Sequence, residues 1–295
     1  MDMNKKLLTL LCLMAVFAII LFRFYPDSLT RKLKRLADNS QARISVAVIR
    51  GEQNWSIEQE SRPLLSVFKF PIALCTLRAL ENADAGLDTQ LRISGEMLDF
   101  NTWSPMLKKH PHPPFSISVA DLLRYMVSES DNNAADILLA YGGGIPALNR
   151  CLAEAGFSGI SINVNEKTMN ENIKTQYQNT ARPSDIVRLI KYARESNFLS
   201  AQSRRFLDRI MLETATGADK LKAGLPPQTP LGHKTGSSSR LPDDLKIADN
   251  DAGFVRLPDG SFYYIAVFVS DSRLSDAENA AIIAAISRTV YDSFK

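Results

Sequence analysis

The chain has 295 residues, of which 45% are hydrophobic and 23% are charged. This is the composition of an ordinary globular protein, and it argues against long disordered tracts and repeats. The net charge of +3 is small for this length and no dense Lys/Arg block is present, so nucleic acid is not an expected partner.

A targeting segment is expected at residues 1–25. Lys5 and Lys6 precede an uncharged apolar run from residue 7 to residue 22, in the order of the n- and h-regions of a secretory signal. We therefore expect export to the periplasm. Sixteen residues of helix span about 24 Å, less than the roughly 30 Å of membrane hydrocarbon, so an uncleaved inner-membrane tether is the less favoured alternative.

The mature chain is expected to open with a helix and a hairpin. Leucines recur at helical spacing in residues 27–37. Residues 42–49 then alternate in period two and carry β-branched side chains, which is typical of a strand. Residues 55–58 could pair with this strand.

The first candidate for chemistry is the pair Ser66 and Lys69, at the predicted start of a helix. Residues three apart lie on one helix face, so the lysine amine could take the proton of the serine hydroxyl. The free N–H groups of a helix start could also hold an oxyanion. Pro71 fits a helix that begins near Ser66. Taken alone, the S-x-x-K pattern is weak, because it also describes a solvated serine before a helical lysine.

Residues 87–114 are expected to be rich in loops, because prolines interrupt every regular pattern. His110 and His112 have the spacing of metal ligands, but no further ligand follows and the chain has only three histidines. We expect neither a metal nor a cofactor.

Cys75 and Cys151 are the two cysteines outside the targeting segment. They could pair in an oxidising compartment. Both lie in apolar helical patterns, where a free thiol behaves as a small buried hydrophobe, and we therefore expect two free thiols.

The middle of the chain is predicted to be mostly helical. Residues 118–127 form one helix, with Ser118 as its N-cap and Asp121 at the capping-box position. The polar run of residues 128–133 follows, and it is either a solvated turn or a turn that faces a cleft. Further helices are expected at residues 134–141, 147–155, 183–196 and 200–213. Residues 158–180, which contain Glu166 and Asn170, show no long period and are expected to form a loop.

The end of the chain predicts strands and a final helix. Residues 234–237 should form an edge strand, with Gly236 allowing close approach of substrate to the backbone. Residues 252–269 alternate around an Asp-Gly turn, and residues 275–294 form an amphipathic helix. These elements predict an α+β fold: an antiparallel sheet built from both termini and flanked by helices (about 26–62 and 214–295), an all-α lobe (about 63–213), and an active site between them.

Four motifs follow one another along the chain, in this order: Ser66-x-x-Lys69, Ser130-Asp131-Asn132, Glu166-x-x-Met169-Asn170 and Lys234-Thr235-Gly236. Over residues 40–295 the chain resembles the class A enzymes of the serine β-lactamase and penicillin-binding protein superfamily. Val164 and Asn179 replace an Arg and an Asp that usually clamp the Glu166 loop, and in this the chain is similar to a divergent branch that includes extended-spectrum cephalosporinases. Neither Cys75 nor Cys151 lies where some class A enzymes have a disulfide.

The resemblance implies a role for each motif residue in a monomeric enzyme that hydrolyses small β-lactams. Ser66 would attack the lactam carbonyl, with Lys69 or Glu166 as the base, and Ser130 would pass a proton to the leaving nitrogen. Glu166 would activate the water that releases the acyl group. Substrate would be bound by Asn132, Asn170, Lys234, Thr235, Gly236 and Ser237, with Trp103 at the rim or serving as a packed loop anchor. The backbone N–H groups of Ser66 and Ser237 would form the oxyanion hole.

Two other functions fit parts of the pattern. A D,D-peptidase of cell-wall synthesis shares three motifs but lacks a water-activating glutamate in this loop. A β-lactam sensor would be acylated and stay acylated.

Overall fold

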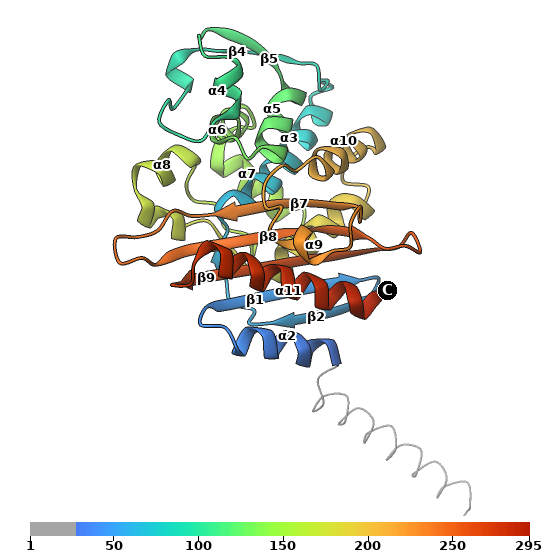
Figure 1. Cartoon of the computed structure of the whole chain (residues 1–295). Coiled ribbons are helices and arrows are strands. Elements are labelled where there is room, and N and C mark those ends of the chain that lie inside the picture. The colour runs from blue at the N-terminus through green and yellow to red at the C-terminus, as the bar shows by residue number, and fades with distance from the viewer. Residues whose placement is uncertain (1–27) are drawn as a thin grey trace, which may run out of the picture.

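The fold is built on a five-stranded antiparallel sheet, seen in a computed structural model that describes residues 28–295 (Figure 1). The expected targeting segment, residues 1–25, lies outside the described residues. The strand order is β2-β1-β9-β8-β7, so both ends of the chain contribute to one sheet, as predicted. The strands are β1 (Arg43–Arg50), β2 (Gln53–Ile57), β7 (Leu231–Ser237), β8 (Lys246–Arg256) and β9 (Phe262–Ser272).

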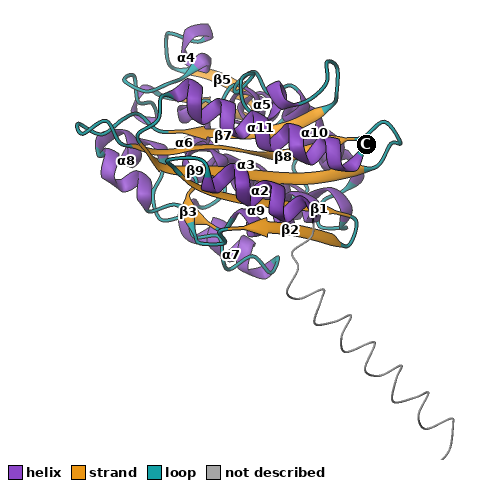
Figure 2. Ribbon diagram, turned by 60° about the horizontal axis from the view of Figure 1, so that its bottom comes forward, coloured by secondary structure: helices purple, strands orange, loops and turns teal. Residues whose placement is uncertain are grey.

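Helices cover both faces of this sheet. The two terminal helices, α2 (Ser28–Asp38) and α11 (Asp276–Phe294), lie side by side over one face, as Figure 2 shows. Leu33 and Ile283 are fully buried there against strand residues such as Val46, because each helix turns its apolar stripe inward. Helix α9 (Pro183–Glu195) packs on β1 and β9 from the other face.

The remaining helices gather beyond β7, the edge strand (Figure 1). They are α3 (Lys69–Asn82), α4 (Pro105–Lys109), α5 (Val119–Ser128), α6 (Asn132–Tyr141), α7 (Gly144–Glu154), α8 (Glu166–Glu171) and α10 (Ala201–Leu212). The predicted cap of α5 is present: Ser118 Oγ accepts a hydrogen bond from Asp121 N at 3.0 Å. Among residues 28–295, no helix combines the length and apolarity that crossing a membrane requires.

The two segments predicted as loops contain short elements. Residues 87–114 include β4 (Gln90–Ile93), which pairs with β5 (Phe115–Ser118), and the helix α4. The 158–180 loop contains α8 and a 3-10 helix, Ile173–Tyr177. These elements are too short to show a hydrophobic period, and contacts with the rest of the fold hold them in place.

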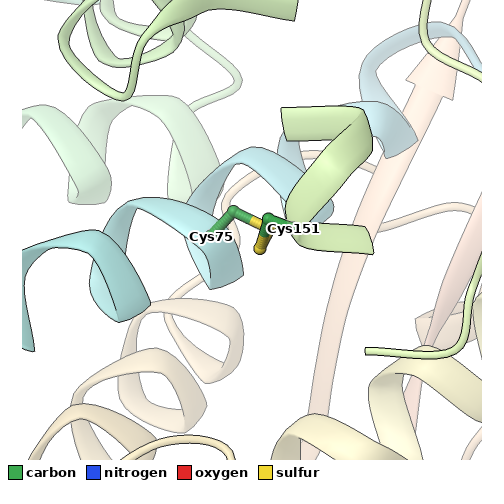
Figure 3. The surroundings of a disulfide bond; sticks show 2 residues. All are labelled: Cys75 and Cys151. Carbon is green, nitrogen blue, oxygen red and sulfur yellow. A yellow bond between two sulfur atoms is a disulfide. The ribbon is translucent and has the colours of Figure 1, made fainter. Parts of the chain in front are cut away.

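Cys75 and Cys151 form a disulfide, so the prediction of two free thiols is wrong. Figure 3 shows the bond joining α3 to α7. The two Cα atoms are 6.2 Å apart. Both cysteines are only half-buried. Helical periodicity placed each cysteine on an apolar pattern, but it could not show that α3 and α7 pack with these positions facing each other.

Candidate active site

Ser66 lies on a 3-10 helix, Leu65–Phe68, that leads directly into α3. Leu65 has a positive φ of 46°, a region that bulky residues rarely enter, so surrounding contacts must hold this bend. Strand β7 supplies such contacts. A Cβ at Gly236 would lie 2.5 Å from Leu64 O and 3.0 Å from Val67 N. Glycine is thus needed at 236 because the strand approaches the backbone of the serine segment itself.

Lys69 lies at the centre of the site and is fully buried. Its Nζ donates to Ser66 Oγ at 3.0 Å and to Asn132 Oδ1 at 2.6 Å. It also donates to the backbone carbonyl of Ser130 at 2.8 Å and forms an ion pair with Glu166 Oε1 at 2.9 Å. A buried amine needs such partners, and here they hold the amine beside the serine hydroxyl.

Ser130 connects the two lysines of the site. Its hydroxyl accepts from Lys234 Nζ at 2.9 Å and lies 3.4 Å from Lys69 Nζ. The backbone of Ser130 has a positive φ of 59°, at the point where the polar run between α5 and α6 meets Lys69 and Lys234. Burial, together with the nearby charge of Lys69, lowers the pKa of Lys234 well below its ordinary value.

Glu166 begins α8 and points into the site, where its side chain is buried. Its Oε1 accepts from Ser66 Oγ at 3.3 Å. Asn170 lies one helical turn further along α8, on the same side as Glu166 but exposed. Its Nδ2 donates to Asp99 Oδ2 at 3.0 Å and to Asn101 O at 3.4 Å.

The loop that carries Glu166 is closed by the amide of Asn179, which is fully buried. Asn179 Oδ1 accepts from Asn163 N at 2.8 Å and from Val164 N at 3.0 Å, and its Nδ2 donates to Val164 O at 2.9 Å. The backbone carbonyl of Asn179 accepts from Leu64 N at 2.8 Å, next to the serine segment. Neutral hydrogen bonds therefore join the two ends of the loop at positions 164 and 179.

A carboxylate that the sequence analysis missed, Asp136 on α6, holds the start of α8. Its Oδ1 accepts from Glu166 N at 2.8 Å and its Oδ2 from Lys167 N at 2.9 Å, so it satisfies two N–H groups at the start of that helix. Burial raises the pKa of Asp136 to about 6. The sequence carried no local signal for this contact, because 30 residues separate the partners.

Asp131, the middle residue of its motif, is fully buried and has a structural role that sequence analysis also missed. It caps α6 by accepting from Ala134 N at 2.9 Å, and it accepts from Ser104 Oγ at 2.8 Å. Burial raises its pKa. The signal was available, since Asp before a helical run is a common N-cap.

The other predicted residues line the same region. Asn132 Nδ2 donates to Thr102 Oγ1 at 2.8 Å, and Thr235 Oγ1 lies 2.7 Å from Thr216 Oγ1. Ser237 is exposed at the end of β7. Trp103 is 54% exposed, yet its Nε1 donates to Glu129 O at 3.0 Å, so it is both exposed and anchored. In residues 28–295, no group of three or more His, Cys, Asp or Glu side chains is placed to hold a metal ion.

Residues 28–294 match the β-lactamase enzyme family. A β-lactamase of Bacteroides uniformis is 39% identical over 99% of this chain and 100% of its own length. The crystal structure of a class A β-lactamase from Bacteroides cellulosilyticus is 41% identical, covers 90% of this chain and 96% of that one, and superposes with a TM-score of 0.87. The chain belongs to the class A serine β-lactamases. It is thus a β-lactam hydrolase of the kind that gives antibiotic resistance.

Two further relatives of this β-lactamase carry names that state a substrate range. The extended-spectrum β-lactamase PER-1 of Pseudomonas aeruginosa is 35% identical over 79% of this chain and 75% of its own length. The structure of the TLA-3 extended-spectrum β-lactamase is also 35% identical, covers 90% of this chain and 98% of that one, and has a TM-score of 0.88.

Replacing Asn179 with alanine should loosen the Glu166 loop of this β-lactamase. The change removes three hydrogen bonds from a buried position, and it should lower the free energy of unfolding by about 3 kcal/mol and slow turnover about tenfold or more. Thermal unfolding, limited proteolysis and kcat measure these effects. Gln178→Ala, a change at the exposed neighbouring side chain, is the control. Equal protease resistance in Asn179→Ala and the parent would refute the role of this amide.

Asp136 should make the stability of this β-lactamase depend on pH. Its folded pKa of about 6 lies above the ordinary value of 3.8, so the folded chain holds more protons than the unfolded chain between these values. This contribution to stability is fully present below about pH 4 and is lost as the pH rises through 6. Relative to Asp136→Asn, the parent should therefore gain about 1 kcal/mol as the pH falls from about 7 to about 5. Thermal unfolding of both proteins across this range measures the difference, and parallel curves would contradict the assignment.

Proposed function

We propose that this enzyme hydrolyses β-lactams through an acyl-enzyme on Ser66 that a water activated by Glu166 then clears. One observation carries the proposal: Glu166 Oε1 lies 3.3 Å from Ser66 Oγ and 2.9 Å from Lys69 Nζ, inside the site. A carboxylate in this position is within one water molecule's reach of an ester on Ser66. A D,D-peptidase needs no such group.

In the acylation step, Ser66 Oγ attacks the lactam carbonyl carbon and loses its proton to Lys69 or, through a water, to Glu166. Lys69 Nζ lies 3.0 Å from Ser66 Oγ, and Glu166 Oε1 lies 2.9 Å from Lys69 Nζ. Lys69 can take the serine proton only after it has given one of its own to Glu166 across this contact, whereas Glu166 can act as the carboxylate of the ion pair. The carbonyl oxygen becomes an oxyanion, which the backbone N–H groups of Ser66 and Ser237 stabilise, each donor of this kind being worth roughly 3–4 kcal/mol.

Collapse of the tetrahedral intermediate breaks the lactam C–N bond. Ser130 gives its hydroxyl proton to the leaving nitrogen and is resupplied by the lysines that contact it, at 2.9 Å from Lys234 and 3.4 Å from Lys69. In deacylation, Glu166 takes a proton from the water that attacks the ester, and Asn170 helps to hold that water. Ser66 is then released with its proton restored.

Substrate binding is assigned to the walls of the site. Lys234, Thr235 and Ser237 bind the carboxylate that penicillins and cephalosporins carry, Asn132 binds the side-chain amide, and the backbone at Gly236 lies along the substrate. Trp103 forms an apolar rim.

Substrate range and location complete the proposal. Val164, the neutral clamp at Asn179 and the extended-spectrum relatives favour cephalosporins among the substrates. We propose that the chain is exported to the periplasm by residues 1–25, and that it works as a monomer whose site lies between a sheet lobe and a helical lobe.

Steady-state kinetics test the function directly. The purified enzyme should turn over a chromogenic cephalosporin many times per molecule, and Ser66→Ala should abolish this reaction. A burst of one product per enzyme without turnover would instead indicate a β-lactam sensor. Release of terminal D-alanine from a cell-wall peptide without β-lactam turnover would indicate a D,D-peptidase.

A further inference from the structure

The contact between Asn170 and Asp99 joins two segments that flank the candidate site. Asn170 lies on α8, and Asp99 lies 71 residues earlier, in the segment between β4 and α4. Asp99 is half-buried, and its Oδ2 accepts from Asn170 Nδ2 at 3.0 Å. The carbonyl of Asn101 accepts from the same Nδ2 at 3.4 Å.

The backbone of Asp99 is held in position by the buried side-chain amide of Asn133. Asn133 on α6 is 3% exposed, and its side chain forms hydrogen bonds with both the N–H and the C=O group of Asp99. Asn133 Oδ1 accepts from Asp99 N at 2.7 Å, and Asn133 Nδ2 donates to Asp99 O at 2.9 Å. In addition, Asp99 Oδ1 accepts from Asn101 N at 2.8 Å, which sets the rotation of the carboxylate. The other oxygen is thus held toward α8.

The side-chain amide of an asparagine has an oxygen that accepts hydrogen bonds and an NH₂ group that donates them, and rotation by 180° exchanges the two. An ionised carboxylate only accepts hydrogen bonds, as does the Asn101 carbonyl. Together these groups select the orientation in which Asn170 Nδ2 faces Asp99, and Asn170 Oδ1 is left as an acceptor. Glu166 and Asn170 are four residues apart on α8, so their side chains lie on the same side of the helix.

We propose that Asp99 is a positioning residue for deacylation, which acts by fixing the amide orientation of Asn170. This inference rests on the proposed function, because it needs a water that attacks the ester on Ser66. Such a water has two protons. One goes to Glu166, and Asn170 Oδ1 accepts a hydrogen bond from the other, which leaves a lone pair of the water directed at the acyl carbon. A flipped amide would present N–H groups to the water and compete for that lone pair.

Asp99→Asn tests the inference with almost no change in shape. The hydrogen bond from Asn101 N should hold the new amide oxygen in place of Asp99 Oδ1, so the amide nitrogen should face Asn170 Nδ2 and the present orientation of Asn170 should be disfavoured. Deacylation should slow about tenfold, which is the range expected for the loss of one charge-assisted hydrogen bond. When deacylation limits turnover, kcat and KM should fall together while kcat/KM stays constant. Mass spectrometry during turnover should show more acylated enzyme than in the parent.

Three further variants separate the explanations. Glu96→Gln removes an exposed carboxylate from the same segment and should behave as the parent does. In an Asn170→Ala background, Asp99→Asn should change kcat less than about twofold, because the group through which it acts is gone. If Asp99→Asn slows both backgrounds equally, or lowers kcat/KM through a disturbed segment, the inference is overturned.

Glu166→Ala shows whether the proposed function itself holds: if this variant accumulates acyl-enzyme while Asp99→Asn matches the parent, only the role of Asp99 fails.

Discussion

Glu166→Ala is expected to lower the steady-state turnover of a chromogenic cephalosporin about a thousandfold, the middle of the range for loss of a general base. The side chain is buried beside Ser66 and Lys69 and is the acid in contact with both. Without it, water can still reach an ester on Ser66, but nothing removes its proton. The covalent adduct should therefore persist, and intact-protein mass spectrometry should detect it at one substrate per enzyme.

The matched control for this experiment is Glu171→Gln, at an exposed carboxylate on the last residue of α8. It should leave turnover unchanged. Stopped-flow measurement of the burst in Glu166→Ala also identifies the acylation base. A burst as fast as the parent's assigns the first proton transfer to Lys69, and a much slower burst assigns it to Glu166. Turnover by Glu166→Ala at the parent rate would remove the basis of the proposed deacylation.

Loss of the Cys75–Cys151 bond should give the second large effect, this time on stability. The bond closes a loop with a sequence separation of 76, and a loop of this length corresponds to about 4 kcal/mol of reduced unfolded-state entropy. For a domain of this size we expect the midpoint of thermal unfolding to fall by about 10 °C. Unfolding of the parent with and without a reductant measures the change.

The double variant Cys75→Ser, Cys151→Ser provides the control for the reductant. It should unfold at the temperature of the reduced parent and should not respond to reductant. Turnover at room temperature should survive, because Cys75 lies well over one helical turn beyond Lys69 on α3. If the oxidised and reduced parents unfold at the same temperature, the bond contributes nothing measurable.

Local patterns predicted the parts of this fold that depend on local physics. The cap at Ser118 and the final amphipathic helix over residues 275–294 followed from residue type and periodicity, and the structure has both. The pairing of Ser66 with Lys69 also follows from helical spacing, and Ser66 Oγ lies 3.0 Å from Lys69 Nζ. Each of these features depends on residues that are close together in the sequence.

Contacts between distant segments were not predictable in the same way. The partners Cys75 and Cys151 are 76 residues apart, and Asp99 and Asn170 are 71 apart. Asp136 looks like any polar residue on α6 until the fold brings the start of α8 to it. The positions of these side chains depend on how helices pack, and a single sequence does not contain that information in its periodicity.

The uncharged clamp at Asn179 has a consequence for the solutions in which the enzyme works. Dissolved ions weaken attraction between opposite charges, whereas they hardly affect hydrogen bonds between neutral, buried groups. Val164 and Asn179 offer no such attraction to weaken. The closure of the loop at positions 164 and 179 should therefore depend little on salt concentration, from dilute buffer to concentrated brine.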